Sequence, residues 1–387
     1  MLYITLLDQF HPGIYSSQVI DVCDHLNKNH KANIQLVAFL SLRELLRTDA
    51  RKRLKDLSPN AIVLPAFPKL RYFEWTAILL FFVCLFTGRR KAICRNVFCT
   101  NMAFKVKKTG LLKKVILDGR SAMAAEIKEY DVFPVDYIRN NVSLFEKKAV
   151  VEADYRIAVS NALINYWRRE YNYLENNHVI IPCTLDNKYF GSNFVFSSDK
   201  TQVLRNQMGI SKNDVLFVYS GSTAPWQSFE LMEQFLSPCL AQNESIKVLF
   251  LSKMTKDIEK LQIEYPGRII QKWIEHHEIL DYLSCADYGL LLRENSVTNQ
   301  VASPTKFGEY LFAGLNVLIS PDLGDYTKFV IDNNCGLVIS SESVKKFPQV
   351  LPEQKNANRK LAERHFTKHS QEVNSQYEKL LSALSQP

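Results

Sequence analysis

The chain alternates short apolar runs with longer amphipathic segments, and this alternation constrains its fold more than any other feature. Seven runs in the first half have the length and composition of buried strands: Leu2–Leu7, Ile34–Phe39, Ala61–Leu64, Lys91–Val97, Lys114–Leu117, Tyr155–Val159 and Val179–Ile181. Segments with helical periodicity lie between them: Ser17–Lys28, Leu42–Lys55, Ala122–Tyr130, Val135–Glu152 and Ser160–Tyr171. Strands separated by helices connect as right-handed βαβ units, so this order predicts a mostly parallel sheet.

The alternation begins again after a polar stretch at residues 187–213, which predicts a linker with a short helix at Ser198–Met208. The strands expected beyond it are Val215–Ser220, Ile246–Leu251, Arg268–Ile270, Tyr288–Leu292, Val317–Ser320 and Gly336–Ile339. The helices expected there are Gln227–Leu240, His277–Cys285, Thr305–Ala313 and Asn356–Ser385.

We therefore predict an α/β protein with two Rossmann-like, doubly wound domains. The expected boundaries are residues 1–190 for the first domain, 191–213 for the linker, 214–365 for the second domain and 366–387 for a C-terminal helix that crosses back to the first domain. Two such domains in tandem are expected to face each other across a cleft and to bind ligands at the carboxyl ends of their strands.

Charge is distributed unevenly between the two halves. Residues 1–150 contain 24 Lys and Arg against 13 Asp and Glu, a net charge of +11, whereas the remainder has a net charge of −3. This asymmetry predicts an anionic partner for the first domain. The chain shows no recognisable nucleic-acid-binding module, so we do not expect that partner to be nucleic acid.

The segment Trp75–Gly88 is uncharged, apolar and aromatic, and it precedes Arg89, Arg90 and Lys91. Its uncharged part is shorter than the roughly 18 residues that a membrane-spanning helix needs. Because further cations lie between residues 69 and 114, we expect peripheral contact with an anionic membrane. The alternative is a buried helix between two strands.

Eight cysteines are scattered along the chain without Cys-x-x-Cys or zinc-ligand spacing. They are typical of buried thiols in a reducing compartment. The N-terminal MLYITLLD lacks the basic region of a signal peptide. We expect a cytoplasmic protein, at the inner face of the plasma membrane.

The segment Val301–Ser320 is the most informative one for function. Ser303 and Pro304 suit the N-cap and first position of a helix, whose free N–H groups attract a phosphate. Lys306 adds a full positive charge, and Glu309 lies one turn further on, where it can accept hydrogen bonds from ribose hydroxyls. The alternative is a well-capped core helix with a solvated Lys and Glu.

These residues resemble the donor-binding helix of retaining GT-B glycosyltransferases of the family 4 type. Other segments resemble that family in the same order along the chain: Pro12–Val19, Asp118–Arg120, Ala153–Ser160, Ile180–Asp186, Val218–Ser222 and Ala286–Leu290. The resemblance implies a GT-B fold and transfer of a sugar from a nucleotide-diphosphate sugar with retention of configuration. It also implies that Glu309 binds the ribose, while Ser303, Thr305 and Gly221 contribute to donor binding.

The chain departs from the family at three positions. Val301 stands where the family usually has a Glu, while Ser222 and Gln227 stand where it usually has the Arg and Lys that neutralise the diphosphate. The resemblance therefore leaves Ser222 and Gln227 at the donor site and needs other cations for catalysis. Lys306 is the first candidate, Arg293 the second and Lys253 the third. For Arg293 an ordinary surface position at a strand end is the alternative, and for Lys253 the corresponding alternative is favoured.

The acceptor is expected at the basic first domain. Gly13 and Tyr15 lie in the glycine-containing segment after the first strand, and Arg95 follows another strand. Asp118 and Arg120 stand near the position of a His common in the family, and we expect them to take part in catalysis. Their alternative is a mutual ion pair.

The chain contains no Asp-x-Asp, so we expect no cofactor and a metal-independent reaction, with helix N–H groups and Lys or Arg at the diphosphate. The expected acceptor is a glycan or a lipid-linked glycan, in surface polysaccharide synthesis. Two alternatives stay open, namely a nucleotide-sugar epimerase of the same fold and a catalytically inactive nucleotide-sugar-binding subunit.

Overall fold

Parallel strands form two separate sheets, one in each half of the chain. A computed structural model describes residues 1–7, 12–47, 49–67, 69–131, 135–190, 196–222, 224–340 and 346–385. Contacts between residues group 1–186, 301–303 and 371–387 into a first unit, and 187–300 and 304–370 into a second. The first unit thus ends four residues before the boundary that the sequence predicts, and residues 191–195 of the expected linker lie outside the described residues.

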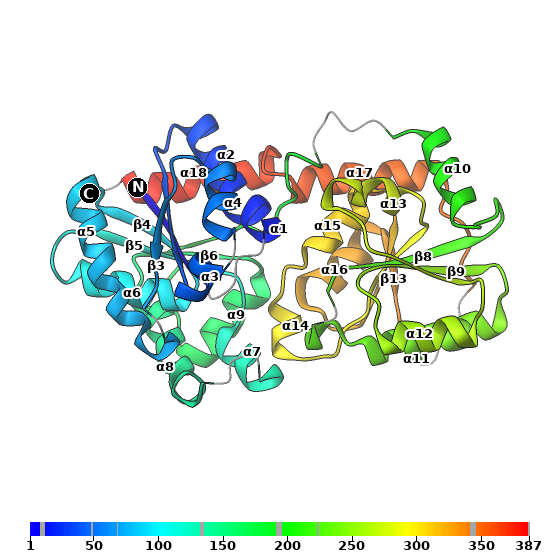
Figure 1. The fold of residues 1–387 in the computed structure, drawn as a ribbon, viewed down its shortest axis with the longest axis horizontal. Coiled ribbons are helices and arrows are strands. Elements are labelled where there is room, and N and C mark those ends of the chain that lie inside the picture. The colour runs from blue at the N-terminus through cyan, green and yellow to red at the C-terminus, as the bar shows by residue number, and fades with distance from the viewer. Residues whose placement is uncertain are drawn as a thin grey trace. The chain divides into compact units, whose positions relative to one another are not determined.

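The first unit contains a seven-stranded parallel sheet of order β3-β2-β1-β4-β5-β6-β7. Its strands are β1 (Leu2–Leu7), β2 (Gln35–Leu40), β3 (Ile62–Pro65), β4 (Lys91–Arg95), β5 (Lys114–Gly119), β6 (Tyr155–Ala158) and β7 (His178–Ile180). Helices cover both faces, so the strands are buried on each side and consist largely of continuous apolar residues (Figure 1).

Helical segments connect all the consecutive strands of this unit, and one more, α18, follows from the C-terminal end of the chain. They are α1 (Pro12–Tyr15), the π-helix η1 (Ser16–Ile20), α2 (Asp21–His30), α3 (Leu42–Arg47), α4 (Ala50–Leu57), the 3-10 helix η2 (Leu70–Thr76), α5 (Ala77–Thr87), α6 (Val97–Lys107), α7 (Met123–Tyr130), α8 (Asp136–Glu152), α9 (Asn161–Tyr171) and α18 (Gln371–Ser385).

The last helix, α18, packs on the sheet of the first unit beside α2 (Figure 1). Its residues Val373, Tyr377, Leu380 and Leu384 recur at helical spacing and join the hydrophobic core that η1 and α2 also build. The Lys114 ammonium donates to the carbonyl of Ala383 at 3.3 Å, where the C-terminal end of a helix attracts a positive charge.

The second unit contains a six-stranded parallel sheet of order β10-β9-β8-β11-β12-β13. Its strands are β8 (Val215–Ser220), β9 (Ile246–Leu251), β10 (Ile269–Lys272), β11 (Tyr288–Leu291), β12 (Asn316–Ile319) and β13 (Gly336–Val338). In both sheets, a strand order that runs 3-2-1-4-5-6 is that of a doubly wound Rossmann-like domain. The predicted fold class is confirmed.

Helices cover both faces of the second sheet as well, with α11 and α12 on one face and α13 and α17 on the other (Figure 1). The helical segments are α10 (Ser198–Gln207), η3 (Pro225–Gln227), α11 (Phe229–Gln242), α12 (Lys256–Glu264), η4 (His276–Glu278), α13 (Ile279–Ser284), α14 (Val297–Val301), α15 (Thr305–Phe312), α16 (Gly324–Asn333) and α17 (Pro352–Phe366). The single C-terminal helix expected from the sequence is two helices, α17 and α18, separated at residues 367–370.

Candidate functional site

Helix α15 lies against the carboxyl ends of β8 and β11 because Tyr310 fixes it there. A Cβ on Gly289 would lie 2.3 Å from the Tyr310 ring, so only glycine allows the helix this close to β11. The Tyr310 hydroxyl accepts from the N–H of Ser220 at 3.0 Å and donates to the carbonyl of Leu290 at 3.4 Å. The first turn of α15 is thereby placed at the edge of the sheet where ligands of such domains bind.

Lys306 projects from this first turn into a buried position, with 8% of its surface exposed. Its ammonium donates to Oε1 of Gln227 at 2.9 Å and lies 4.1 Å from the centre of the Tyr219 ring, a cation–π contact. Gly221 has φ of +141°, and a Cβ there would lie 2.9 Å from Nζ of Lys306. Glycine is therefore favoured at this position by the backbone conformation, and a methyl group there would have to displace the Lys306 ammonium.

Arg293 reaches the same amide oxygen from the loop after β11. Its backbone N–H donates to Oγ of Ser320 at 2.8 Å, and its side chain is buried. The guanidinium donates to Oε1 of Gln227 at 3.3 Å and lies 3.5 Å from Oδ1 of Asn299. Two cations from separate elements thus converge on one neutral oxygen.

This convergence makes the site electrostatically positive. Burial, followed by the charge of Arg293, lowers the pKa of Lys306 well below its ordinary value, while Glu309 opposes the shift. Among the described residues, no carboxylate lies within 4.0 Å of the Lys306 ammonium. The contribution of Arg293 to this shift reflects a positive potential, which favours an anion, and the adjacent start of α15 adds its N–H groups.

The other residues predicted for donor binding or for neutralising the diphosphate differ in burial and in their contacts. Glu309 is buried one turn after Lys306, and Thr305 is the first residue of α15. Ser222 is exposed, and its carbonyl accepts from the Tyr219 hydroxyl. The ammonium of Lys253 lies 5.5 Å from the centre of the Trp273 ring, a contact outside the cluster around Gln227.

Ser303 does not hold the helix position that the sequence predicts. The N-cap of α15 is Pro304, and Ser303 groups with the first unit, where its Oγ accepts from the N–H of Cys183 at 2.8 Å. The expectation that Ser303 caps the helix is wrong by one residue, because its hydroxyl is held by the backbone that follows β7.

In the first unit, the carboxyl ends of β4 and β5 carry two guanidinium groups around one carboxylate. Asp118 has no exposed surface, and it lies 2.7 Å from Nε of Arg120 and 3.8 Å from a guanidinium nitrogen of Arg95. The Tyr3 hydroxyl also donates to Asp118. The structure favours the ion-pair alternative, in which Asp118 positions Arg95 and Arg120 rather than contacting a substrate.

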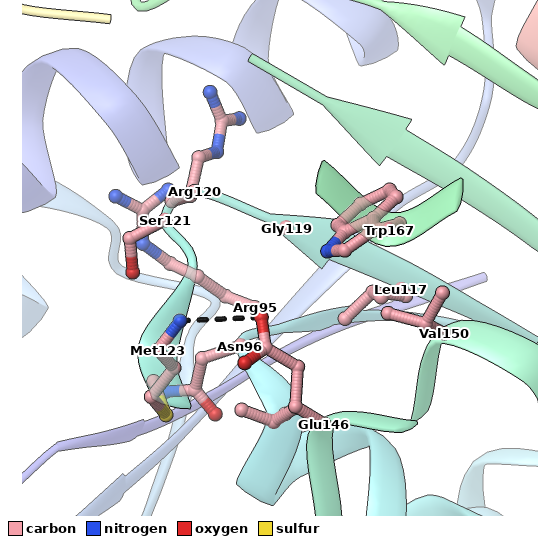
Figure 2. A pocket seen from close by; sticks show the side chains of 11 residues that line it. Arg95, Asn96, Leu117, Gly119, Arg120, Ser121, Met123, Glu146, Val150 and Trp167 are labelled. Atoms are coloured by element: carbon pink, nitrogen blue, oxygen red, sulfur yellow. Dashed lines mark hydrogen bonds between the residues drawn. The ribbon is translucent and has the colours of Figure 1, made fainter. Parts of the chain in front are cut away.

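Arg95, Arg120 and Glu146 line the same pocket (Figure 2). The Glu146 carboxylate accepts from the backbone N–H groups of Met123 at 3.2 Å and Ala124 at 2.7 Å, so it caps the start of α7. Burial raises the pKa of Glu146 to about 7, although these hydrogen bonds oppose the shift. The pocket therefore combines two fixed cations with one titrating acid.

The two remaining acceptor-side predictions are not brought to this pocket. Tyr15 is fully buried, and its hydroxyl shares a 2.7 Å hydrogen bond with Oγ1 of Thr5, so it does not line this pocket and its acceptor contact stays a prediction. Gly13 is exposed within the helical turn α1 instead of in a loop, and residues 8–11, which precede the expected loop, lie outside the described residues.

Sequence reasoning missed several residues that build these sites. Tyr219 in the second unit, and Tyr3 and Glu146 in the first, lie far in sequence from the groups they contact, whereas Asn299 follows Arg293 by six residues. Within the described part of the chain, no group of three or more His, Cys, Asp or Glu residues is placed to hold a metal ion.

Solved structures resemble this chain over its whole length. A glycosyltransferase from Rickettsia africae is 12% identical with a TM-score of 0.70, covering 100% of this chain and 99% of that one. HepE from Anabaena, in complex with UDP and glucose, is 13% identical with a TM-score of 0.67, covering 100% and 99%. A proposed UDP-N-acetylglucosamine 2-epimerase from Listeria monocytogenes is 10% identical with a TM-score of 0.57, covering 99% and 95%.

No protein-family model and no curated protein matches the sequence. At these identities the structural likeness establishes the fold alone. The chain has the GT-B fold, with two Rossmann-like domains, as its sequence predicts.

Proposed function

We propose that this protein is a glycosyltransferase that moves a sugar, with retention of anomeric configuration, from a nucleotide-diphosphate sugar to a glycan or lipid-linked acceptor. One observation carries the proposal, namely the convergence of Lys306 and Arg293 on the neutral amide oxygen of Gln227 beside the start of α15. A diphosphate offers the two positive side chains the anionic oxygens that Gln227 lacks.

The proposed chemistry places this positive site at the leaving group. Cleavage of the sugar–phosphate bond builds negative charge on the diphosphate, and fixed cations aimed at that charge lower the barrier. Lys306 and Arg293 stabilise the diphosphate, the N–H groups at Thr305 contribute hydrogen bonds, and Glu309 accepts from the ribose hydroxyls. In this proposal, helix and side-chain charges neutralise the diphosphate without a metal ion.

The acceptor in this proposal binds at the first unit. Arg95 and Arg120 lie at the carboxyl end of its sheet and line a pocket, with Asp118 fixing their guanidinium groups. Two guanidinium groups suit an acceptor that carries phosphate. A lipid-linked glycan of surface polysaccharide synthesis at the inner face of the plasma membrane has that chemistry.

Two other functions are compatible with the GT-B fold. An epimerase would act on the donor alone, whereas a transferase needs a second substrate, for which the basic first unit is suited. An inactive subunit would bind the nucleotide sugar without turnover. Incubation with donor alone, and then with candidate acceptors, separates the three by the products formed.

The nucleotide is identified first by thermal shift against a panel of nucleoside diphosphates. A ligand at 100-fold above its dissociation constant stabilises the fold by about 2.7 kcal/mol, which such a panel detects. Calorimetry then compares donor affinity in the wild type and two variants, and the product assay compares their turnover. Glu309→Ala should weaken donor binding strongly. Lys306→Met should lower turnover more than affinity. Lys253→Met removes a cation that lies over the Trp273 ring, outside the cluster around Gln227, and should change neither. Wild-type behaviour in both site variants would refute the proposal.

A further inference from the structure

The helical segment formed by η2 and α5 exposes large apolar side chains along one face. The exposed fractions are 58% for Trp75, 48% for Ile78, 46% for Phe82, 50% for Leu85 and 82% for Phe86. At about 100° per residue, these five positions fall within an arc of about 100° on the helix surface. We call this set the α5 ridge.

The opposite face of the same segment is part of the protein core. Phe73, Thr76, Leu80 and Cys84 are buried, and α5 packs against α6. By length and composition, residues 70–87 form a helix that could cross a membrane, and 28% of these residues are buried in the protein. However, the segment connects β3 to β4 within one sheet, so it cannot cross a bilayer without leaving that sheet. The exposed ridge is therefore suited to lie in the plane of an interface.

The ridge lies within the most basic part of the chain. Residues 69–114 contain eleven Lys and Arg and a single acidic residue, Glu74. Some of these cations are held by carbonyl, amide or carboxylate groups of the protein, namely Arg89, Lys91, Arg95, Lys107 and Lys114.

Other cations are exposed at both ends of the ridge. Lys69 and Arg71 lie at its start, and Arg90 follows its end. Lys113 is also exposed. It lies beside Arg90, since its backbone N–H donates to the Arg90 carbonyl at 2.7 Å. Lys105 joins the first group through its 3.0 Å ion pair with Glu74. An apolar, aromatic ridge between two groups of cations matches the acyl boundary and anionic headgroups of one membrane surface.

We infer that the α5 ridge docks on an anionic lipid membrane, with its apolar side chains in the interface and Lys69, Arg71, Arg90 and Lys113 among the headgroups. Charge complementarity favours this partner over a second copy of the chain, because two copies would bring like-charged groups together. Docking does not depend on the proposed sugar transfer, and it is measured without nucleotide.

The test is flotation of the full chain with vesicles of phosphatidylglycerol and phosphatidylcholine in equal parts, at low salt, against vesicles of phosphatidylcholine alone. We expect binding to the anionic vesicles that falls as salt rises. Arg90→Gln and Lys69→Gln should each weaken the partition coefficient about fivefold. Phe86→Ser should weaken it about tenfold or more, since the exposed ring no longer enters the interface.

Matched controls are Lys256→Gln and Leu174→Ser, which alter an exposed cation and an exposed apolar residue outside the ridge and should bind as the wild type does. Thermal unfolding shows whether each variant is folded. Absence of binding at low salt, or binding that the ridge variants do not weaken, would overturn the proposal. A dimer seen by sedimentation velocity, lost in Phe86→Ser and accompanied by no vesicle binding, would assign the ridge to a second copy instead.

Discussion

Gln227→Glu tests whether the positive cluster of the second unit is a diphosphate site, because it changes stability and binding in opposite directions. The substitution places a carboxylate oxygen where the amide oxygen now lies, 2.9 Å from the Lys306 ammonium and 3.3 Å from the Arg293 guanidinium. At an effective dielectric constant of about 20, each of these pairs is worth about 5 kcal/mol of attraction.

Most of that attraction, about 10 kcal/mol for the two pairs, is cancelled by the several kcal/mol needed to remove the new carboxylate from water and by the loss of the two charge-assisted hydrogen bonds, about 1.5–3 kcal/mol each, that the amide oxygen already accepts. We expect a net rise of about 1–2 kcal/mol in the free energy of unfolding, measured by urea denaturation. The same carboxylate occupies both cations, so a diphosphate has to compete with it. A loss of about 3 kcal/mol in binding corresponds to an affinity more than 100-fold weaker, measured by calorimetry with the nucleoside diphosphate that stabilises the wild type most.

Two control variants separate competition at Lys306 and Arg293 from the loss of the Gln227 side chain and from the added negative charge. Gln227→Met keeps the volume but removes the acceptor, so the free energy of unfolding should fall by about 1–3 kcal/mol. Gln202→Glu adds the same charge on the exposed face of α10 and should leave binding unchanged. If Gln227→Glu binds the diphosphate as tightly as the wild type does, Lys306 and Arg293 do not receive it and the assignment of the donor site fails.

Two further predictions concern the backbone at Gly221 and the protonation of Glu146. Gly221→Ala should lower the free energy of unfolding by about 1–3 kcal/mol and weaken nucleotide binding, because the new methyl group lies against Lys306 and the residue has a strained φ. The control is Gly209→Ala, which is also at positive φ but has open space around it. This variant should leave nucleotide binding intact. Glu146 has its pKa raised from 4.5 to about 7, so the folded protein holds a proton that the unfolded chain has released. The free energy of unfolding should therefore fall by up to about 3 kcal/mol as pH rises from about 4.5 to about 7. Urea denaturation across that pH range should show this slope in the wild type and not in Glu146→Gln, and equal slopes would contradict the raised pKa.

The strands could be predicted from the sequence because a parallel sheet buries both faces of each strand. Every expected strand appears, and β1, β8 and β9 have the expected boundaries. Helix α6 was missed for the converse reason. It packs against α5, α8 and the sheet, and nine of its eleven residues are buried, so its sequence lacks the polar stripe that marks a helix at a surface.

The candidate site was predictable only as far as its chemistry is local. Lys306 and Glu309 share one turn of one helix, so their spacing alone indicates a common face. The contact of Arg293 with Gln227 joins residues 66 positions apart and depends on how β8 and β11 are paired. Asp118 could not be interpreted from its residue type. An aspartate suggests a catalytic role, but Asp118 is completely buried among Tyr3, Arg95 and Arg120, where it positions the two guanidinium groups.

The departures at Ser222 and Gln227 bear on whether this chain retains donor binding. The resemblance to family 4 places an Arg and a Lys in this region, and a neutral pair there suggests a lost site. In the structure, however, Gln227 gathers Lys306 and Arg293 from two later elements, and Ser222 follows the glycine against which Lys306 packs. The positive charge is thus present at this edge of the sheet although its source in the sequence differs. Because a diphosphate responds to the position of charge and not to the element that supplies it, the substitutions at these two positions alone do not predict an inactive subunit.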